Sequence, residues 1–174
     1  MARRAAAITT VGAAQPRWFS RLAKPLSPHE ASDAAAYAVS LGLPPECAVI
    51  ADWSEVERIV RDPRSADGWW NREEAERQRL MQETANRIGG DLLLETLSAA
   101  VEGHAATTFA RAVEAGGGEA MARVASGAAL MAIHNRSLAL LAGMGAHHVF
   151  VQKYALFASG RWPLGTLGTQ LKLF

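Results

Sequence analysis

The sequence predicts an all-α protein, and three observations carry that prediction. Alanine, the residue with the highest helix propensity, is the most abundant of the 174 residues. Apolar side chains recur at the three- and four-residue spacing of amphipathic helices, and glycine or proline separates the helical segments. The pattern favours about six helices, arranged as a two-helix N-terminal unit, a four-helix bundle and a short extended C-terminal tail. We expect a flexible basic arm over residues 1–25, the two-helix unit over 26–66 and the bundle with its tail over 67–174.

The first two helices are predicted from their start and stop signals. Ser27-Pro28-His29-Glu30 has the pattern of a capping box with proline in the first turn, which predicts a helix from Pro28 to about Leu41. A second helix is expected to start near Pro45. A second capping pattern at Asp52 marks a break and a new start within it, and Pro63 ends it.

The later helices are separated by glycines. The expected ranges are residues 72–88, 92–115, 119–141 and 146–158, with the run Gly116-Gly117-Gly118 between the second and third of these helices. The helix over 119–141 is apolar almost all round, which predicts burial at the centre of the bundle. Residues 166–174 are expected to be extended, and strand should be confined mainly to this tail.

The charges are segregated along the chain although the net charge is only +1. Residues 1–29 and 120–174 each carry five basic side chains and no acid, whereas residues 30–119 carry all 17 acids. The simplest interpretation is that the two basic ends fold against the acidic middle. An anionic partner for one basic end is the alternative, but such sparse basic residues make a nucleic-acid-binding role unlikely.

Several classes of site and location are excluded or disfavoured. A single cysteine, Cys47, excludes an intramolecular disulfide and a cysteine-cluster zinc site, and it fits a reducing, bacterial-type cytoplasm. No uninterrupted apolar window approaches ~20 residues, so we expect no membrane association. The acid-free N-terminus resembles a signal or transit segment only weakly, and a disordered arm is the preferred interpretation. Nucleotide, dinucleotide and His-Glu-x-x-His motifs are missing, so we assign no catalytic residue, metal or cofactor.

Four polar residues in apolar surroundings are weak candidates for ligand binding. These are His104, His134, Arg136 and His148. A histidine in such a position is more often structural than a ligand. Arg136 lies in the least polar helix, where a charge requires a partner, and Glu95 or Glu102 on a facing helix is the expected acid. The same arginine could instead bind a carboxylate or phosphate ligand.

The sequence favours one function and leaves a second open. The preferred hypothesis is a non-enzymatic helical interaction module, such as an adaptor, an assembly factor or a regulatory subunit, which binds a protein partner or itself. The alternative is a small-molecule-binding protein or enzyme with an inter-helix site formed by His104, His134 and Arg136. Exposed apolar patches without a deep pocket would favour the first, and a polar cavity around these three residues would favour the second.

Overall fold

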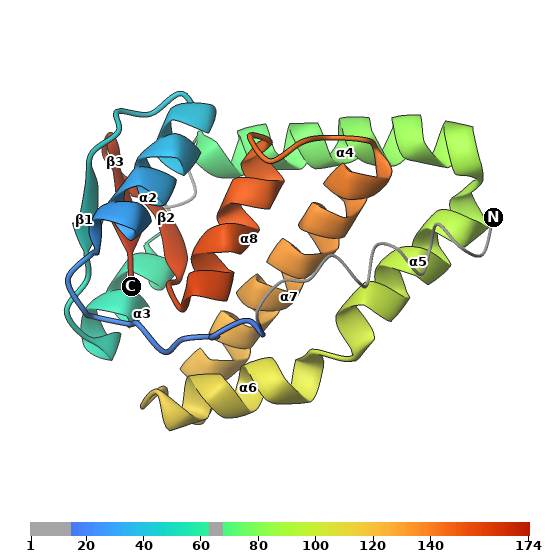
Figure 1. The fold of residues 1–174 in the computed structure, drawn as a ribbon. Coiled ribbons are helices and arrows are strands. Elements are labelled where there is room, and N and C mark those ends of the chain that lie inside the picture. Colours follow the sequence, from blue (N-terminus) through green and yellow to red (C-terminus); the bar gives the residue numbers. More distant parts are fainter. Residues whose placement is uncertain (1–14, 63–67) are drawn as a thin grey trace.

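Helices make up 64% of the residues that the computed structural model describes, which are residues 15–62 and 68–174, and a small sheet completes the fold (Figure 1). The helices are α2 (Pro28–Ser40), α3 (Trp53–Arg61), α4 (Trp69–Ile88), α5 (Gly90–Glu102), α6 (Ala105–Glu114), α7 (Glu119–Leu141) and α8 (Val149–Ser159). The strands are β1 (Cys47–Val49), β2 (Pro163–Leu167) and β3 (Gln170–Leu173). The predicted predominance of helix is therefore confirmed.

The predicted capping signals form the starts of α2 and α3. The Ser27 hydroxyl accepts a 3.3 Å hydrogen bond from the Glu30 backbone N–H, and the Ser27 N–H donates to the Glu30 carboxylate at 2.8 Å. At α3, the Asp52 carboxylate accepts from the Glu55 N–H at 2.9 Å. Both pairs satisfy amide groups that a helix start leaves without a partner.

The helix predicted from Pro45 is wrong, because residues 47–49 form strand β1. β1 lies parallel to β3, with Cys47 opposite Leu171 and Val49 opposite Leu173. The extended backbone of β1 thus bonds to a strand far away in the sequence, which no local helix signal could indicate. The predicted extended tail is a hairpin of β2 and β3, and the sheet order is β1-β3-β2.

The sheet lies at one end of the molecule beside α2 and α3, while α4, α5 and α7 extend away from it (Figure 1). Gly165 in β2 has a φ of 127°, and a Cβ there would lie 2.7 Å from the indole nitrogen of Trp69. Glycine at this position allows the first turn of α4 to pack closely on the sheet.

The helix predicted over 92–115 is two helices, α5 and α6, which meet at Gly103 and His104. The chain changes direction there, so that both helices can pack on α7. Buried polar groups join α6 to α7, since the hydroxyls of Thr108 and Ser126 lie 2.6 Å apart.

The expected flexible arm over residues 1–25 falls partly outside the described residues, and its described part is fixed to the core. Trp18 and Phe19 are 3% and 2% exposed. The Arg17 N–H also donates to the Ala158 carbonyl at 2.9 Å. The prediction of an arm is therefore wrong for residues 15–25, because two aromatic side chains anchor a segment that has no helical periodicity.

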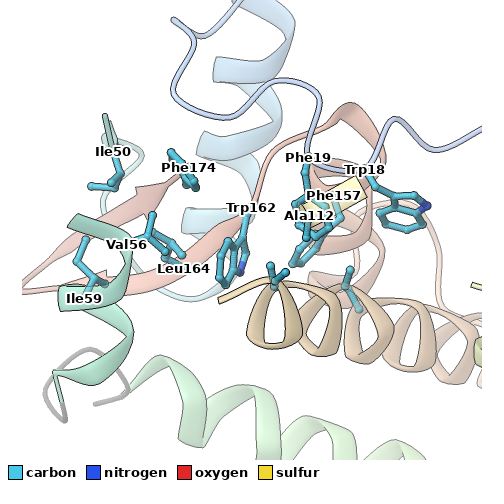
Figure 2. Packing of buried hydrophobic residues seen from close by; sticks show 14 of the residues in the cluster. Trp18, Phe19, Ile50, Val56, Ile59, Ala112, Phe157, Trp162, Leu164 and Phe174 are labelled. Carbon is cyan, nitrogen blue, oxygen red and sulfur yellow. The ribbon is translucent and has the colours of Figure 1, made fainter. Parts of the chain in front are cut away.

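The largest hydrophobic cluster brings distant segments together through aromatic rings (Figure 2). Phe19 packs edge-on against both Phe157 and Trp162, with ring centroids 6.3 Å apart in each case. Trp53 packs against Trp162 and Phe174 and donates its indole N–H to the Ala115 carbonyl at 2.9 Å.

Among the described helices, only α7 is long and apolar enough to cross a membrane, and half of its most apolar window is buried within the molecule.

A buried ion pair holds the N-terminal segment against the end of α8. Arg161 is fully buried, and its guanidinium donates to both carboxylate oxygens of Glu30 at 3.1 and 3.2 Å. The same group donates to the carbonyls of Lys24 and Pro25 at 2.5 and 2.7 Å. Arg21 adds a partly exposed contact to Glu30 at 3.2 Å. The sequence suggested that the basic ends pair with the acidic middle. At Glu30 they do, because Arg21 and Arg161 both bind its carboxylate.

Alanine variants of two tryptophans test whether the N-terminal segment belongs to the core. Replacing buried Trp18 with alanine should reduce the unfolding free energy by about 3–5 kcal/mol, as for other large buried aromatics. Trp70 is 46% exposed, and Trp70→Ala should change stability by only about 0.5 kcal/mol. Denaturant melts of the two variants would measure this difference, and equal effects would contradict the assigned burial of Trp18.

Candidate functional site

Two members of the inter-helix site predicted from His104, His134 and Arg136 contact a linked pair of aromatic rings. His104 precedes α6 and packs edge-on against Trp18, with ring centroids 6.1 Å apart. Trp18 in turn packs against Tyr154 of α8 at 5.9 Å, and the Arg136 guanidinium lies 4.4 Å from the Tyr154 ring centroid. Neither His104 nor Arg136 lines either of the two cavities described below. Trp18 and Tyr154 thus link His104 to Arg136 through ring contacts.

The acid partner predicted for Arg136 is wrong. Within the described residues, Arg136 forms no ion pair with Glu95 or Glu102 and instead lies over the face of Tyr154. Arg136 is only half-buried, so its charge stays partly solvated while the ring attracts it. Burial raises the pKa of Tyr154, and the nearby Arg136 charge opposes that rise.

The two remaining candidates lie in different places. The Nδ1 of His134 is 3.2 Å from the side-chain oxygen of its neighbour Asn135. His148 caps α8, where its Nδ1 accepts from the Phe150 N–H at 3.3 Å while its Nε2 lies 2.9 Å from a Glu76 oxygen. Both ring nitrogens of His148 are thus used within the chain. Of His104, His134, Arg136 and His148, only His148 lines either of the two cavities described below.

A buried polar network fixes the first turn of α4. Glu73 is 5% exposed; its Oε1 accepts from the Tyr37 hydroxyl at 2.7 Å, and its Oε2 accepts from the Lys153 ammonium at 2.5 Å. Lys153 also lies 4.6 Å from the ring centroid of Trp69. Burial and the adjacent Glu73 carboxylate raise the pKa of Tyr37 well above its ordinary value. The network joins α2, α4 and α8, so it sets how α4 lies against the bundle.

A groove of about 260 Å³ runs between α4 and α7, and we call it the α4–α7 groove. The residues that line it are Trp70, Glu73, Glu74, Arg77, Met131 and Asn135. Its α4 members recur at helical spacing, and the α7 pair is four residues apart, so each helix presents one face to the groove. Trp70 and Met131 form an apolar rim, since they are 46% and 44% exposed.

The charged groups of the groove are satisfied within the chain. Glu73 is bound as described, and both oxygens of Glu74 accept from Arg77 at 2.5 and 2.9 Å. The hydrogen bond from Arg77, with a smaller contribution from Gln78, lowers the pKa of Glu74. Asn135 differs, because the residue is only 4% exposed, yet its amide nitrogen reaches solvent and has no protein acceptor within the described residues. The groove therefore offers an apolar rim and one free N–H donor.

A second cavity, of about 330 Å³, lies on the other side of α4, next to α8. Its lining includes Arg72, Glu73, Glu76 and His148. These groups bind one another or the backbone: Arg72 donates to the Leu41 carbonyl, and Glu76 accepts from Arg79 and contacts His148. Within residues 15–62 and 68–174, no group of three or more His, Cys, Asp or Glu side chains could hold a metal ion. The charged groups of this cavity are thus paired within the chain, and the exposed ring of His147 completes the lining.

The residues that define the groove were not among the sequence candidates. Asn135 lies between His134 and Arg136, and the sequence signal for it was a neutral polar side chain inside an apolar helix, four residues after Met131. Trp70 lies in the first turn of α4, which starts at Trp69. Its exposure could not be read from the sequence, because tryptophan is buried by default.

The network around Glu73 predicts that a lysine variant and an arginine variant differ clearly in unfolding free energy. Lys153→Met leaves the buried Glu73 carboxylate without its cation and should reduce the unfolding free energy by about 3–5 kcal/mol. Arg79→Met removes two ion pairs, to Glu76 and Glu83, from an arginine that is 45% exposed, and it should cost less than about 1 kcal/mol. The double variant Lys153→Met/Glu73→Gln should recover much of the loss. Chemical unfolding would measure all three, and a Lys153 effect as small as that of Arg79 would contradict the network.

Comparisons with known proteins found no relative of this chain. The chain has no significant match among protein-family models, curated proteins or solved structures. The chemistry of the α4–α7 groove is therefore the basis for a functional assignment, and its two distinguishing parts are the exposed apolar rim and the free amide of Asn135.

Proposed function

We propose that this chain is a non-enzymatic protein-interaction module, such as an adaptor, an assembly factor or a regulatory subunit. Its α4–α7 groove receives one apolar side chain of the partner. The observation that carries this proposal is the combination of a half-exposed Trp70 and Met131 with the free amide donor of Asn135. Aromatic residues and methionine are enriched in protein interfaces, and such residues around a small pocket often supply most of the binding energy.

The size of the groove favours an anchor side chain over a free small molecule. Pockets that enclose cofactors or drug-sized ligands typically measure about 300–1,000 Å³ and cover most of the ligand surface. The α4–α7 groove measures about 260 Å³ and is partly open to solvent. Such a groove suits a single side chain that projects from a larger partner, whose surface then covers the rim.

The charges of the groove favour a neutral ligand group. Glu73 and Glu74 are neutralised by Lys153 and Arg77, so neither is available to a metal ion or a cationic ligand. The free Asn135 N–H requires an acceptor, and leaving it unsatisfied after burial would be costly. A peptide supplies both parts at once, because a backbone carbonyl lies next to every apolar side chain. We therefore favour a peptide segment over a phosphate, a metal ion or a charged metabolite.

A neutral peptide fragment tests this function directly. N-acetyl-L-leucine methylamide should produce saturable NMR shifts of the Trp70 indole N–H and the Asn135 side-chain amide, at millimolar concentration as expected for so small a ligand. N-acetylglycine methylamide, which lacks the side chain, should produce much smaller shifts. Titration of ¹⁵N-labelled protein with both compounds would measure the difference.

The matched variants are Trp70→Ala in the groove and Leu94→Ala outside it. Leu94 is 56% exposed on α5 and serves as an exposed apolar control. Trp70→Ala should weaken binding of the leucine compound about tenfold, and Leu94→Ala should leave it unchanged. Shifts of equal size with the glycine compound, or shifts centred away from Trp70 and Asn135, would refute the proposed function.

A further inference from the structure

His148 joins the start of α8 to α4 through both nitrogens of its ring. Its Nδ1 accepts from the Phe150 N–H at 3.3 Å, which caps the first turn of α8. Its Nε2 lies 2.9 Å from a carboxylate oxygen of Glu76 on α4. The His148 side chain is 13% exposed, and Phe150 belongs to the buried cluster that also contains Leu80 and Leu138. A change at this ring therefore acts on a helix cap next to the core.

The two contacts fix where the proton of a neutral His148 lies. The Phe150 backbone N–H is a donor, so Nδ1 must carry the lone pair that accepts from it. The proton of the neutral ring then lies on Nε2 and is donated to Glu76. Only the neutral Nε2–H form makes both contacts at once.

Glu76 keeps its negative charge in the pH range where histidines titrate. Its two oxygens accept from Arg79 at 2.6 and 2.8 Å. This hydrogen bond from Arg79 lowers the pKa of Glu76, burial opposes the effect, and His148 adds to the lowering. A second proton on His148 would therefore leave the ring beside an ionised carboxylate.

The other charged groups near His148 do not compete for its ring. Arg72 and Glu73 of α4 line the same cavity, and each is bound elsewhere within the chain. The residues that the end of α2 contributes to the lining are uncharged, and among the described residues α7 contributes none to it. The neighbouring His147 is exposed. Glu76 is thus the acid that determines how a protonated His148 is held.

A second proton affects the two contacts of His148 in opposite ways. Nδ1 becomes a donor and faces the Phe150 N–H, which is also a donor, so the cap is lost. The new positive charge also lies at a helix N-terminus, where the helix dipole disfavours cations. The contact with Glu76 becomes charge-assisted and is strengthened. Protonation therefore removes the cap and retains the link to α4.

We propose that His148 is a pH-sensitive switch at the start of α8. At neutral pH it caps α8 and binds α4, whereas in mildly acidic solution it binds α4 alone. The first turn of α8 then opens at the wall of the cavity of about 330 Å³. Histidine is the side chain whose charge normally changes between about pH 5 and 8. The switch does not depend on the function proposed for the α4–α7 groove.

NMR spectroscopy of ¹⁵N-labelled protein tests the switch. At about pH 8 the ring nitrogens of His148 should show the Nε2–H tautomer, and at about pH 5 both nitrogens should be protonated. The Phe150 amide should lose at least about fivefold of its protection from hydrogen exchange over this range, after correction for the intrinsic pH dependence, as expected for loss of a helix cap.

His148→Asn and His147→Asn form a matched pair of variants. Asparagine is a strong helix cap that does not titrate, so His148→Asn should keep the protection of the Phe150 amide constant over this pH range. His147→Asn, at the exposed neighbouring histidine, should retain the wild-type response. Glu76→Gln keeps an acceptor but removes the charge that favours the protonated ring, so it should move the midpoint of the response to lower pH.

Several results would each overturn the proposal. One is an Nδ1–H tautomer of His148 at about pH 8, and another is a His148 that stays neutral down to about pH 5. A protonated His148 with unchanged protection of the Phe150 amide would show that the cap does not respond. A loss of protection that is equal in the wild type and in His148→Asn would show that another group causes it.

Discussion

The fold depends on one fully buried arginine. Arg161 lies between the end of α8 and the start of β2, and its side-chain hydrogen bonds within the described residues all reach the chain's N-terminal third. A guanidinium removed from water is stable only when its charge and its N–H groups are satisfied. The Glu30 carboxylate and the carbonyls of Lys24 and Pro25 supply these partners. Burial of Arg161 therefore requires the N-terminal segment to lie against the end of α8.

A closed ring of polar contacts connects the Arg161–Glu30 pair to the α4–α7 groove. Glu30 fixes the first turn of α2, and Tyr37 near the other end of that helix binds Glu73 on α4. Glu73 also binds Lys153 on α8, the helix that ends just before Arg161. The first turn of α4 is thus held from two sides, and this turn carries the aromatic rim of the α4–α7 groove. The rim can remain exposed because the anchoring contacts are buried behind it.

Local signals in the sequence predicted the parts of the fold that depend on local chemistry. The capping patterns and glycine breaks marked α2, α3 and α7, and the segregation of charge indicated that basic ends pair with acids in the middle. Contacts between distant segments could not be predicted in this way. β1 exists because β3 pairs with it, and Trp18 is buried because α6 and α8 leave space for it. At the site, the sequence drew attention to His134 and Arg136, whereas the free donor belongs to Asn135 between them, since only packing decides which side chain lacks a partner.

The pH dependence of stability tests the buried Arg161–Glu30 pair most directly. Burial raises the pKa of Glu30, but hydrogen bonds from Arg161, Arg21 and Ser27 outweigh it and lower the pKa far below the ordinary 4.5. An acid whose pKa is lowered by folding stabilises the protein above its unfolded pKa and loses that contribution as the pH falls. We predict that Glu30→Gln costs about 3–5 kcal/mol of unfolding free energy at pH 7, and that the difference from wild type shrinks steadily below about pH 4.5. A difference that is small at pH 7, or that stays constant down to pH 2, would contradict the central place given to this pair.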